Sequence, residues 1–166
     1  MINSTYQWII DFFRKYPEQK TLLDVGSLDV NGNIREVVPK YVKYTGVDMR
    51  PGANVDVVVN AHNLLTKFAP ESFDVVTCFD TFEHDDMFWI SWDQIKQVTK
   101  KGGFILLGLP SRFCPLHDHP NDYWRFMPGS VDYFYRDFTD VLRSVVHVED
   151  YGQKFENEIY IWGRKP

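Results

Sequence analysis

The stretch Thr21–Asn33, TLLDVGSLDVNGN, decides the fold because an apolar run meets a glycine turn within it. The run from Leu22 to Val25 has the length and apolar character of a buried strand, and it ends at Gly26. The next glycine comes only at Gly32, so the G-x-G-x-x-G pattern of a dinucleotide site and the glycine-lysine pattern of a P-loop are both missing. The sequence therefore predicts a strand followed by a loop that does not cradle phosphate.

Four further apolar runs have strand character and alternate with helical patterns; they cover residues 41–48, 55–60, 72–80 and 104–110. Strands that alternate with helices predict an α/β domain of the Rossmann-like, doubly wound type with a mostly parallel sheet. The runs 140–150 and 157–165 are close enough in sequence to predict an antiparallel strand hairpin in the C-terminal part.

The helices are predicted from apolar spacing and from residues typical of helix ends. We expect Ser4 to cap a first helix that Pro17 ends, and Asn31 to cap a short helix over 34–38. A helix that begins at Asp85-Asp86 is expected to end at Gly102-Gly103, and Pro128 to begin another that runs to about residue 138.

Length and composition favour one cytoplasmic domain spanning residues 1–166. The chain has 18 basic and 23 acidic side chains, and the formal net charge of −5 makes nucleic acid an unexpected partner. Only two cysteines occur, Cys78 and Cys114, and their spacing is that of neither a disulfide framework nor a zinc site. We expect no secretory signal and no membrane span, because no apolar run approaches about 20 residues.

Polar side chains follow four of the five predicted parallel strands. Asp24, Asp48, Asn60 and Asp80 each lie at or just beyond a strand's carboxyl end, where ligands bind in open α/β sheets. Carboxylates and carboxamides suit hydroxyls and amines better than phosphates. A cofactor with a ribose, an adenine and a cationic amino-acid tail fits this set, and S-adenosylmethionine has these parts.

With these motifs in view, the sequence resembles the class I S-adenosylmethionine-dependent methyltransferases, in particular small single-domain members, from Thr21 onward. Asp24-Val25-Gly26 is similar to the family's first motif, although Leu28 and Val30 stand where the family prefers glycine. The remaining matches are Asp48, Asn60-Ala61 with asparagine where aspartate is usual, SFDVVTCFDTFEH, and VTKKGGFILLGLP.

The resemblance implies a role for each matched residue. Asp48 would bind the ribose hydroxyls, Asn60 and Ala61 the adenine edge, and Asp24, Gly26 and Asp80 the amino-acid tail. Ser27 and Met49, next to these motifs, complete the expected cofactor-binding set. The alternative for Asp24 and Asp80 is a structural role in capping or turn formation.

The loop after the fifth strand, residues 111–127, is the expected acceptor site. His117 and His119 are candidate bases near neutral pH, and Asp122 is expected to orient one of them. The substrate-binding candidates are His84, Tyr123, Trp124 and Arg125. The run from Asp122 to Phe126 resembles one found in small bacterial and phage members associated with sugar modification.

Structural alternatives apply to several of these residues. The aromatic side chains of the loop could instead form a hydrophobic latch over the sheet, and His84 could cap the helix that follows it. His117-Asp118-His119 is a weak metal pattern, so we expect no metal and no effect of chelators.

Methyl transfer to an oxygen or nitrogen of a small-molecule or sugar-type acceptor is the leading hypothesis. A methyltransferase-shaped binding module without catalysis is the alternative, and a nicotinamide-dependent oxidoreductase is disfavoured by the missing glycines. Since little of the chain is available to cover a substrate, a homodimer mate or partner subunit could complete the site.

Overall fold

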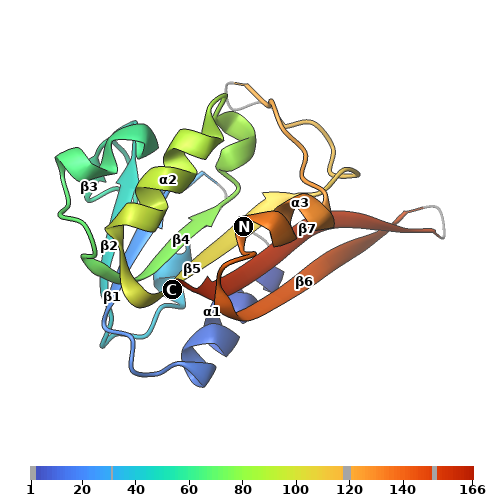
Figure 1. Cartoon of the computed structure of the whole chain (residues 1–166). Helices are drawn as coiled ribbons and strands as arrows, with labels where there is room; N and C mark the ends of the chain where they lie inside the picture. The colour runs from blue at the N-terminus through green and yellow to red at the C-terminus, as the bar shows by residue number, and fades with distance from the viewer. Residues whose placement is uncertain (1–2, 31, 118–120, 151–152) are drawn as a thin grey trace.

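The computed structural model describes residues 3–30, 32–117, 121–150 and 153–166 and contains one seven-stranded sheet (Figure 1). The strand order is β3-β2-β1-β4-β5-β7-β6. The first five strands run parallel, and β7 is inserted antiparallel between β5 and β6. The strands are β1 (Thr21–Val25), β2 (Lys43–Asp48), β3 (Val57–Val58), β4 (Phe73–Phe79), β5 (Thr99–Pro110), β6 (Thr139–Asp150) and β7 (Gln153–Arg164). The predicted mostly parallel α/β sheet with an antiparallel C-terminal hairpin is confirmed.

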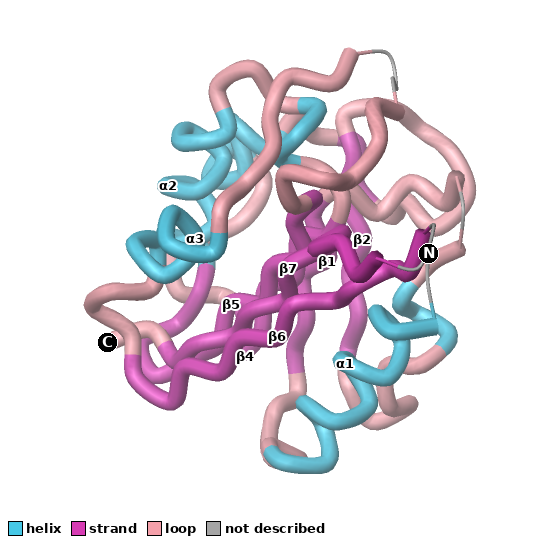
Figure 2. The backbone as a smooth tube through the Cα atoms, turned by 90° about the vertical axis from the view of Figure 1, so that its right-hand side faces the viewer, coloured by secondary structure: helices cyan, strands magenta, loops and turns pink. Residues whose placement is uncertain are grey.

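Helices cover both faces of this sheet, with α1 on one side and α2 and α3 on the other (Figure 2). The α-helices are α1 (Asn3–Lys15), α2 (Phe88–Val98) and α3 (Pro128–Phe134), and the 3-10 helices are η1 (Ile34–Glu36), η2 (Ala61–Thr66) and η3 (Phe82–His84). Because both faces are covered, the central strands β1, β4 and β5 are almost continuously buried, as parallel sheets require.

The amphipathic helix α1 packs against one face of the sheet through aromatic side chains and one buried contact between two hydroxyl groups. Phe12 is fully buried and meets Phe104 of β5 with ring centroids 5.1 Å apart. Thr5 Oγ1 lies 2.8 Å from the Tyr160 hydroxyl of β7. The predicted capping role of Ser4 is wrong, because Ser4 lies inside α1 and its Oγ faces Tyr160 at 3.3 Å.

Two predicted helix ends also differ from the structure. The helix expected to end at Gly102-Gly103 ends at Val98, and β5 runs through both glycines. The two glycines are extended because they pair with Lys165, the residue after β7. Gly102 N–H donates to Lys165 O, and Lys165 N–H donates to Gly103 O. The helix expected to begin at Asp85 begins at Phe88, although an Asp85 oxygen still accepts the Met87 N–H at 2.9 Å.

Three smaller differences concern the ends of other elements. α3 ends at Phe134 rather than near residue 138, and β3 keeps only two residues of the predicted strand 55–60. The predicted cap Asn31 lies outside the described residues, and the residue that precedes η1 is Asn33. Within the part of the chain described, no helix is long and apolar enough to cross a membrane.

Candidate active site

The site is built where β1, β2 and β4 end side by side. Parallel pairing sets Asp24 of β1 opposite Gly46 of β2 and Thr77 of β4. The loops that follow the three strands therefore begin at the same edge of the sheet, the edge at which ligands bind in this architecture.

Gly26 makes the tight turn that leaves β1. Its φ of +79° lies in the left-handed region that favours glycine, and its N–H donates to Val47 O at 2.9 Å. A Cβ at this position would lie 2.0 Å from Thr81 Oγ1. The loop after β1 therefore packs directly against the loop after β4, and only a glycine fits between them.

The rest of the β1 loop is fastened to the loop after β2. Ser27 Oγ donates to Asn54 O at 3.1 Å, and Asn54 Nδ2 donates back to Ser27 O at 2.9 Å. The Leu28 side chain lies against Gly52, where an added Cβ would be 2.3 Å from Leu28 Cδ1. Gly52 thus makes room for Leu28, which stands where the resemblance would place glycine, and Val30 is half-exposed.

Asp24 is buried, and each of its carboxylate oxygens accepts a hydrogen bond from within the sheet. The Tyr44 hydroxyl donates to Oδ2, and Thr77 Oγ1 donates to Oδ1 at 2.7 Å. Burial raises the pKa of Asp24 to about 6, although both hydrogen bonds act in the opposite direction. Its assignment to the amino-acid tail stays a prediction, and a structural role in joining three strands is observed.

The residues expected to bind the nucleoside lie at the ends of β2 and β3. Asp48 Oδ1 accepts the Arg50 N–H at 2.8 Å, and Met49 between them is exposed. Asn60 Oδ1 accepts the His62 N–H at 2.8 Å and so caps η2, which begins at Ala61.

A pair of acidic side chains meets at the ends of β4 and β7. Asp80 follows β4 with φ +47°, and its carboxyl group interacts electrostatically with that of Glu158. Burial and the neighbouring Asp80 raise the pKa of Glu158 to about 9, while burial and Glu83 raise the pKa of Asp80 to about 6. Glu158 therefore carries a proton at neutral pH, and its Oε2 also accepts from the Tyr160 hydroxyl at 2.5 Å.

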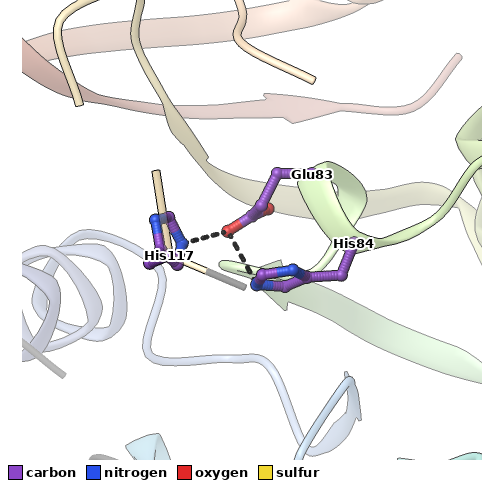
Figure 3. Close-up of side chains that lie close together, drawn as sticks. All are labelled: Glu83, His84 and His117. Carbon is purple, nitrogen blue, oxygen red and sulfur yellow. Dashed lines mark ion pairs between the residues drawn. The ribbon is translucent and has the colours of Figure 1, made fainter. Parts of the chain in front are cut away.

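Glu83, His84 and His117 form a second cluster beside this pair (Figure 3). Glu83 is fully buried, and its Oε1 lies 3.4 Å from His117 Nε2 and 3.7 Å from His84 Nε2. The two imidazole rings are nearly perpendicular, with centroids 5.2 Å apart. The neighbouring Glu83 carboxylate raises the pKa of His117 to about 9. His84 thus faces the acceptor loop and does not cap α2.

Asp122 and Arg125 hold the acceptor loop together. The Arg125 guanidinium donates hydrogen bonds to both Asp122 oxygens, at 2.5 and 2.6 Å. Its other three N–H groups donate to backbone carbonyls. This pairing holds the pKa of Asp122 well below its usual range. Asp122 Oδ2 also accepts the His117 N–H at 2.8 Å, so Asp122 positions His117 through its backbone. All five donors of Arg125 are thus used inside the loop.

The loop aromatics divide between packing and exposure. Trp124 packs against Phe88 with centroids 5.5 Å apart and donates its Nε1–H to Asp85 O at 2.9 Å. Phe126 is buried, whereas Tyr123 remains half-exposed. Trp124 and Phe126 therefore pack as a hydrophobic latch over the sheet, and the substrate-binding candidate Tyr123 is exposed, as is Phe113 of the same loop.

Sequence reasoning missed three residues of this site, Glu83, Glu158 and Tyr44. Glu158 could have been noticed because it shares strand parity with buried Tyr160 and Trp162, where a carboxyl group is unusual. Glu83 lies in the SFDVVTCFDTFEH match but was given no role there, and no comparable signal marks Tyr44. The candidate base His119 lies outside the described residues.

A shallow pocket of about 430 Å³ lies elsewhere, between the β1 loop and η1. It is lined by Asp29, Asn33, Arg35, Glu36, Ala53 and Asn54. None of the sequence-predicted site residues lines it.

Comparison with solved structures defines the fold class. The chain is similar to an S-adenosylmethionine-dependent methyltransferase from Archaeoglobus fulgidus, with a TM-score of 0.71, 14% identity, and coverage of 96% of this chain and 94% of the other. It is also similar to 1,6-didemethyltoxoflavin-N1-methyltransferase from Burkholderia thailandensis, solved with S-adenosylhomocysteine (TM-score 0.69, 12% identity, coverage 96% and 77%). A third is phosphoethanolamine N-methyltransferase 2 from Haemonchus contortus, in complex with S-adenosylmethionine (TM-score 0.68, 14% identity, coverage 99% and 53%). The fold is that of class I methyltransferases.

The family follows from the sequence itself. The family model described as "Methyltransferase domain" matches residues 23–107, just over half of the chain. The protein therefore belongs to this family and is an S-adenosylmethionine-dependent methyltransferase. No curated protein sequence matches it significantly.

The residues present fit S-adenosylmethionine. Gly26 and Gly46 leave no room for a Cβ, because Thr81 lies against Gly26 and Ser27 and Asn54 lie against Gly46, so the strand ends and loops approach closely here. Asp48 offers a carboxylate at the end of β2, and the acidic group of Asp80 and Glu83 suits an ammonium group. The cofactor is thus consistent with the chemistry of these strand ends.

Proposed function

We propose that the protein transfers a methyl group from S-adenosylmethionine to an oxygen or nitrogen atom of a small-molecule or sugar-type acceptor. The observation that carries the proposal is the Glu83–His117 pair, which lies beside Asp80 at the carboxyl end of β4. The bound cofactor supplies an electrophilic methyl group on a positively charged sulfur. The protein's tasks are to bind, to orient and to accept a proton.

Cofactor binding is assigned to the strand ends. Asp48 accepts hydrogen bonds from the two ribose hydroxyls, since a carboxylate can accept two hydrogen bonds. Asn60 and Ala61 contact the adenine edge. Asp80 binds the ammonium group of the amino-acid tail. The raised pKa of Asp80, about 6, leaves it ionised at neutral pH and able to pair with that cation.

Proton acceptance is assigned to His117. Its Nδ1 lies 3.0 Å from Pro115 O, and because a carbonyl only accepts, Nδ1 carries the hydrogen and Nε2 is the atom that can gain or lose a proton. Glu83 stabilises the imidazolium that results. A second cation bound nearby lowers the high pKa of His117, because like charges disfavour the protonated ring. Asp122 keeps the loop and the His117 backbone in place.

The first experiment is calorimetric titration with S-adenosylmethionine and S-adenosylhomocysteine, with a nicotinamide cofactor as the control. Micromolar binding of the first two alone is expected. Binding of the nicotinamide cofactor instead would overturn the proposal. Absence of all binding would favour a methyltransferase-shaped binding module.

The second experiment screens hydroxyl and amine acceptors by S-adenosylhomocysteine formation and compares His117→Ala with His147→Ala. His147 is an exposed histidine on β6 and serves as the matched control. We expect His117→Ala to lose about 100-fold to 10,000-fold in turnover while keeping its cofactor affinity. Undiminished turnover would remove His117 from the mechanism.

A further inference from the structure

A buried carboxylate and two imidazoles converge at one point in the acceptor loop region. One possible ligand atom from each of Glu83, His84 and His117 lies within 4.8 Å of the other two (Figure 3). Ligand atoms around a tetrahedral ion with bonds of about 2.0 to 2.1 Å are roughly 3.3 Å apart. The measured separations of 3.4 and 3.7 Å from the Glu83 oxygen are close to that value.

Both imidazoles are held in the orientation that a metal ligand requires. His84 Nδ1 lies 2.5 Å from Asn121 O, and His117 Nδ1 lies 3.0 Å from Pro115 O. A carbonyl can only accept, so both Nδ1 atoms carry hydrogen and both Nε2 atoms present their lone pairs toward Glu83 when the rings are neutral. A backbone carbonyl behind each ring is the usual arrangement that orients metal-binding histidines.

Glu83 supplies an independent reason to expect a cation. Its side chain is completely buried, and neither carboxylate oxygen makes a hydrogen bond with any of the described residues. A buried carboxylate without hydrogen bonds is costly unless a cation compensates it, and with both imidazoles neutral the compensating cation is a metal ion. The half-exposed side chain of His117 leaves a path by which a small ion can enter.

We propose that Glu83, His84 and His117 bind one divalent transition-metal ion of the Zn²⁺ type, with at least one coordination position left open. Two imidazoles and one carboxylate form a donor set that suits Zn²⁺, Co²⁺ or Fe²⁺ and disfavours Mg²⁺ or Ca²⁺, which prefer oxygen ligands. The sequence did not reveal the site because His117 is far from the adjacent Glu83-His84 pair, and the His117-Asp118-His119 spacing pointed elsewhere.

The ion and the catalytic proton exclude each other in this arrangement. Both use His117 Nε2, so the metal-bound protein cannot use that atom as the base assigned under the proposed function. The metal-bound form is therefore an inhibited form. Methyl transfer itself needs no metal, and the expectation that chelators do not abolish turnover is unchanged.

The test is titration of the chelator-treated protein with Zn²⁺ by calorimetry and with Co²⁺ by visible absorption. We expect one ion per chain and a Co²⁺ spectrum of low coordination number. Glu83→Gln and His117→Ala should each weaken binding by at least 10-fold, whereas His147→Ala should bind as the wild type does. The expected loss follows because even residues behind the ligands typically contribute about 10-fold to 100-fold in metal affinity.

The outcomes separate the metal site from the proposed function. Unaltered Zn²⁺ affinity in His117→Ala, or no stoichiometric binding by the wild type, would overturn the metal site. His117→Ala keeps the test valid if Glu83→Gln does not fold, because the His117 side chain is 44% exposed. S-adenosylmethionine affinity, measured on the same samples, tests the proposed function alone.

Discussion

Replacement of Gly26 by alanine tests whether the turn after β1 is set by backbone conformation alone or also by its contact with the β4 loop. An L-residue at φ +79° costs about 1 to 2 kcal/mol. The added Cβ would also lie 2.0 Å from Thr81 Oγ1, and overpacking of this kind costs about 1 to 3 kcal/mol. We therefore expect Gly26→Ala to lower the free energy of unfolding by about 2 to 5 kcal/mol.

Gly102 provides a matched control for the conformational part. Its φ is +71°, and a Cβ there would meet nothing within 4 Å, so Gly102→Ala carries the backbone cost without the clash. Its expected loss is about 1 to 2 kcal/mol. The two variants, compared by urea unfolding under the same conditions, separate strain from steric overlap.

A double-mutant cycle with Thr81→Ala isolates the contact itself. Truncation of Thr81 removes the two nearest atoms, Oγ1 and Cγ2, and leaves the Thr81 Cβ at 3.0 Å from the Cβ added to Gly26. The loss caused by Gly26→Ala should then shrink toward that of Gly102→Ala. Equal losses in Gly26→Ala and Gly102→Ala, with no coupling to Thr81, would refute the close approach of the two loops.

Three other variants probe the strand ends. Asp48→Ala should weaken S-adenosylmethionine binding by at least about tenfold in calorimetry, since hydrogen bonds to a charged group contribute roughly 1.5 to 3 kcal/mol, while its urea midpoint stays near that of the wild type; unchanged affinity would remove the ribose assignment. Tyr44→Phe removes the hydrogen bond to Asp24 and should lower the free energy of unfolding by about 1 to 3 kcal/mol at pH 7. The loss should be smaller at pH 5, because Asp24 is then mostly protonated. Equal losses at both pH values would argue against an ionised partner. The folded-state pKa of Asp24, raised from 3.8 to about 6, means that the folded protein binds a proton more tightly than the unfolded chain, so stability falls by about 3 kcal/mol as pH rises from 4 through 6. Asp24→Asn should flatten that part of the profile, and an unchanged slope would contradict the shift.

The strands were predictable because burial on both faces leaves a strong sequence signal. β1 begins one residue before the apolar run Leu22–Val25 and ends with it, and β4 and the apolar part of β5 were equally clear. The junction of α2 with β5 was not, since Gly102-Gly103 is typical of a helix end. The two glycines instead pair with Lys165, which is distant in sequence, and local propensity cannot reveal such a contact.

The candidate site was predictable only where residues lie next to a strand end. Asp24, Asp48 and Asp80 follow from topology, because parallel strands bring their carboxyl ends to one edge. Glu83 becomes significant only through its burial and through the loop that returns His117 to it. Arg125 is a different case, because all five of its donors bond within its own loop, a network that the sequence did not reveal, and its contact with substrate stays a prediction.

The position of β7 between β5 and β6 has a consequence for how the chain assembles. Until Gln153–Arg164 has paired, β5 is an open edge whose residues Phe104–Leu109 are all buried and mostly apolar in the folded protein. Long, apolar open edges recruit strands from other chains. Substitutions that delay docking of β7 should therefore reduce the yield of folded protein through aggregation, even where the stability of the finished fold is unchanged.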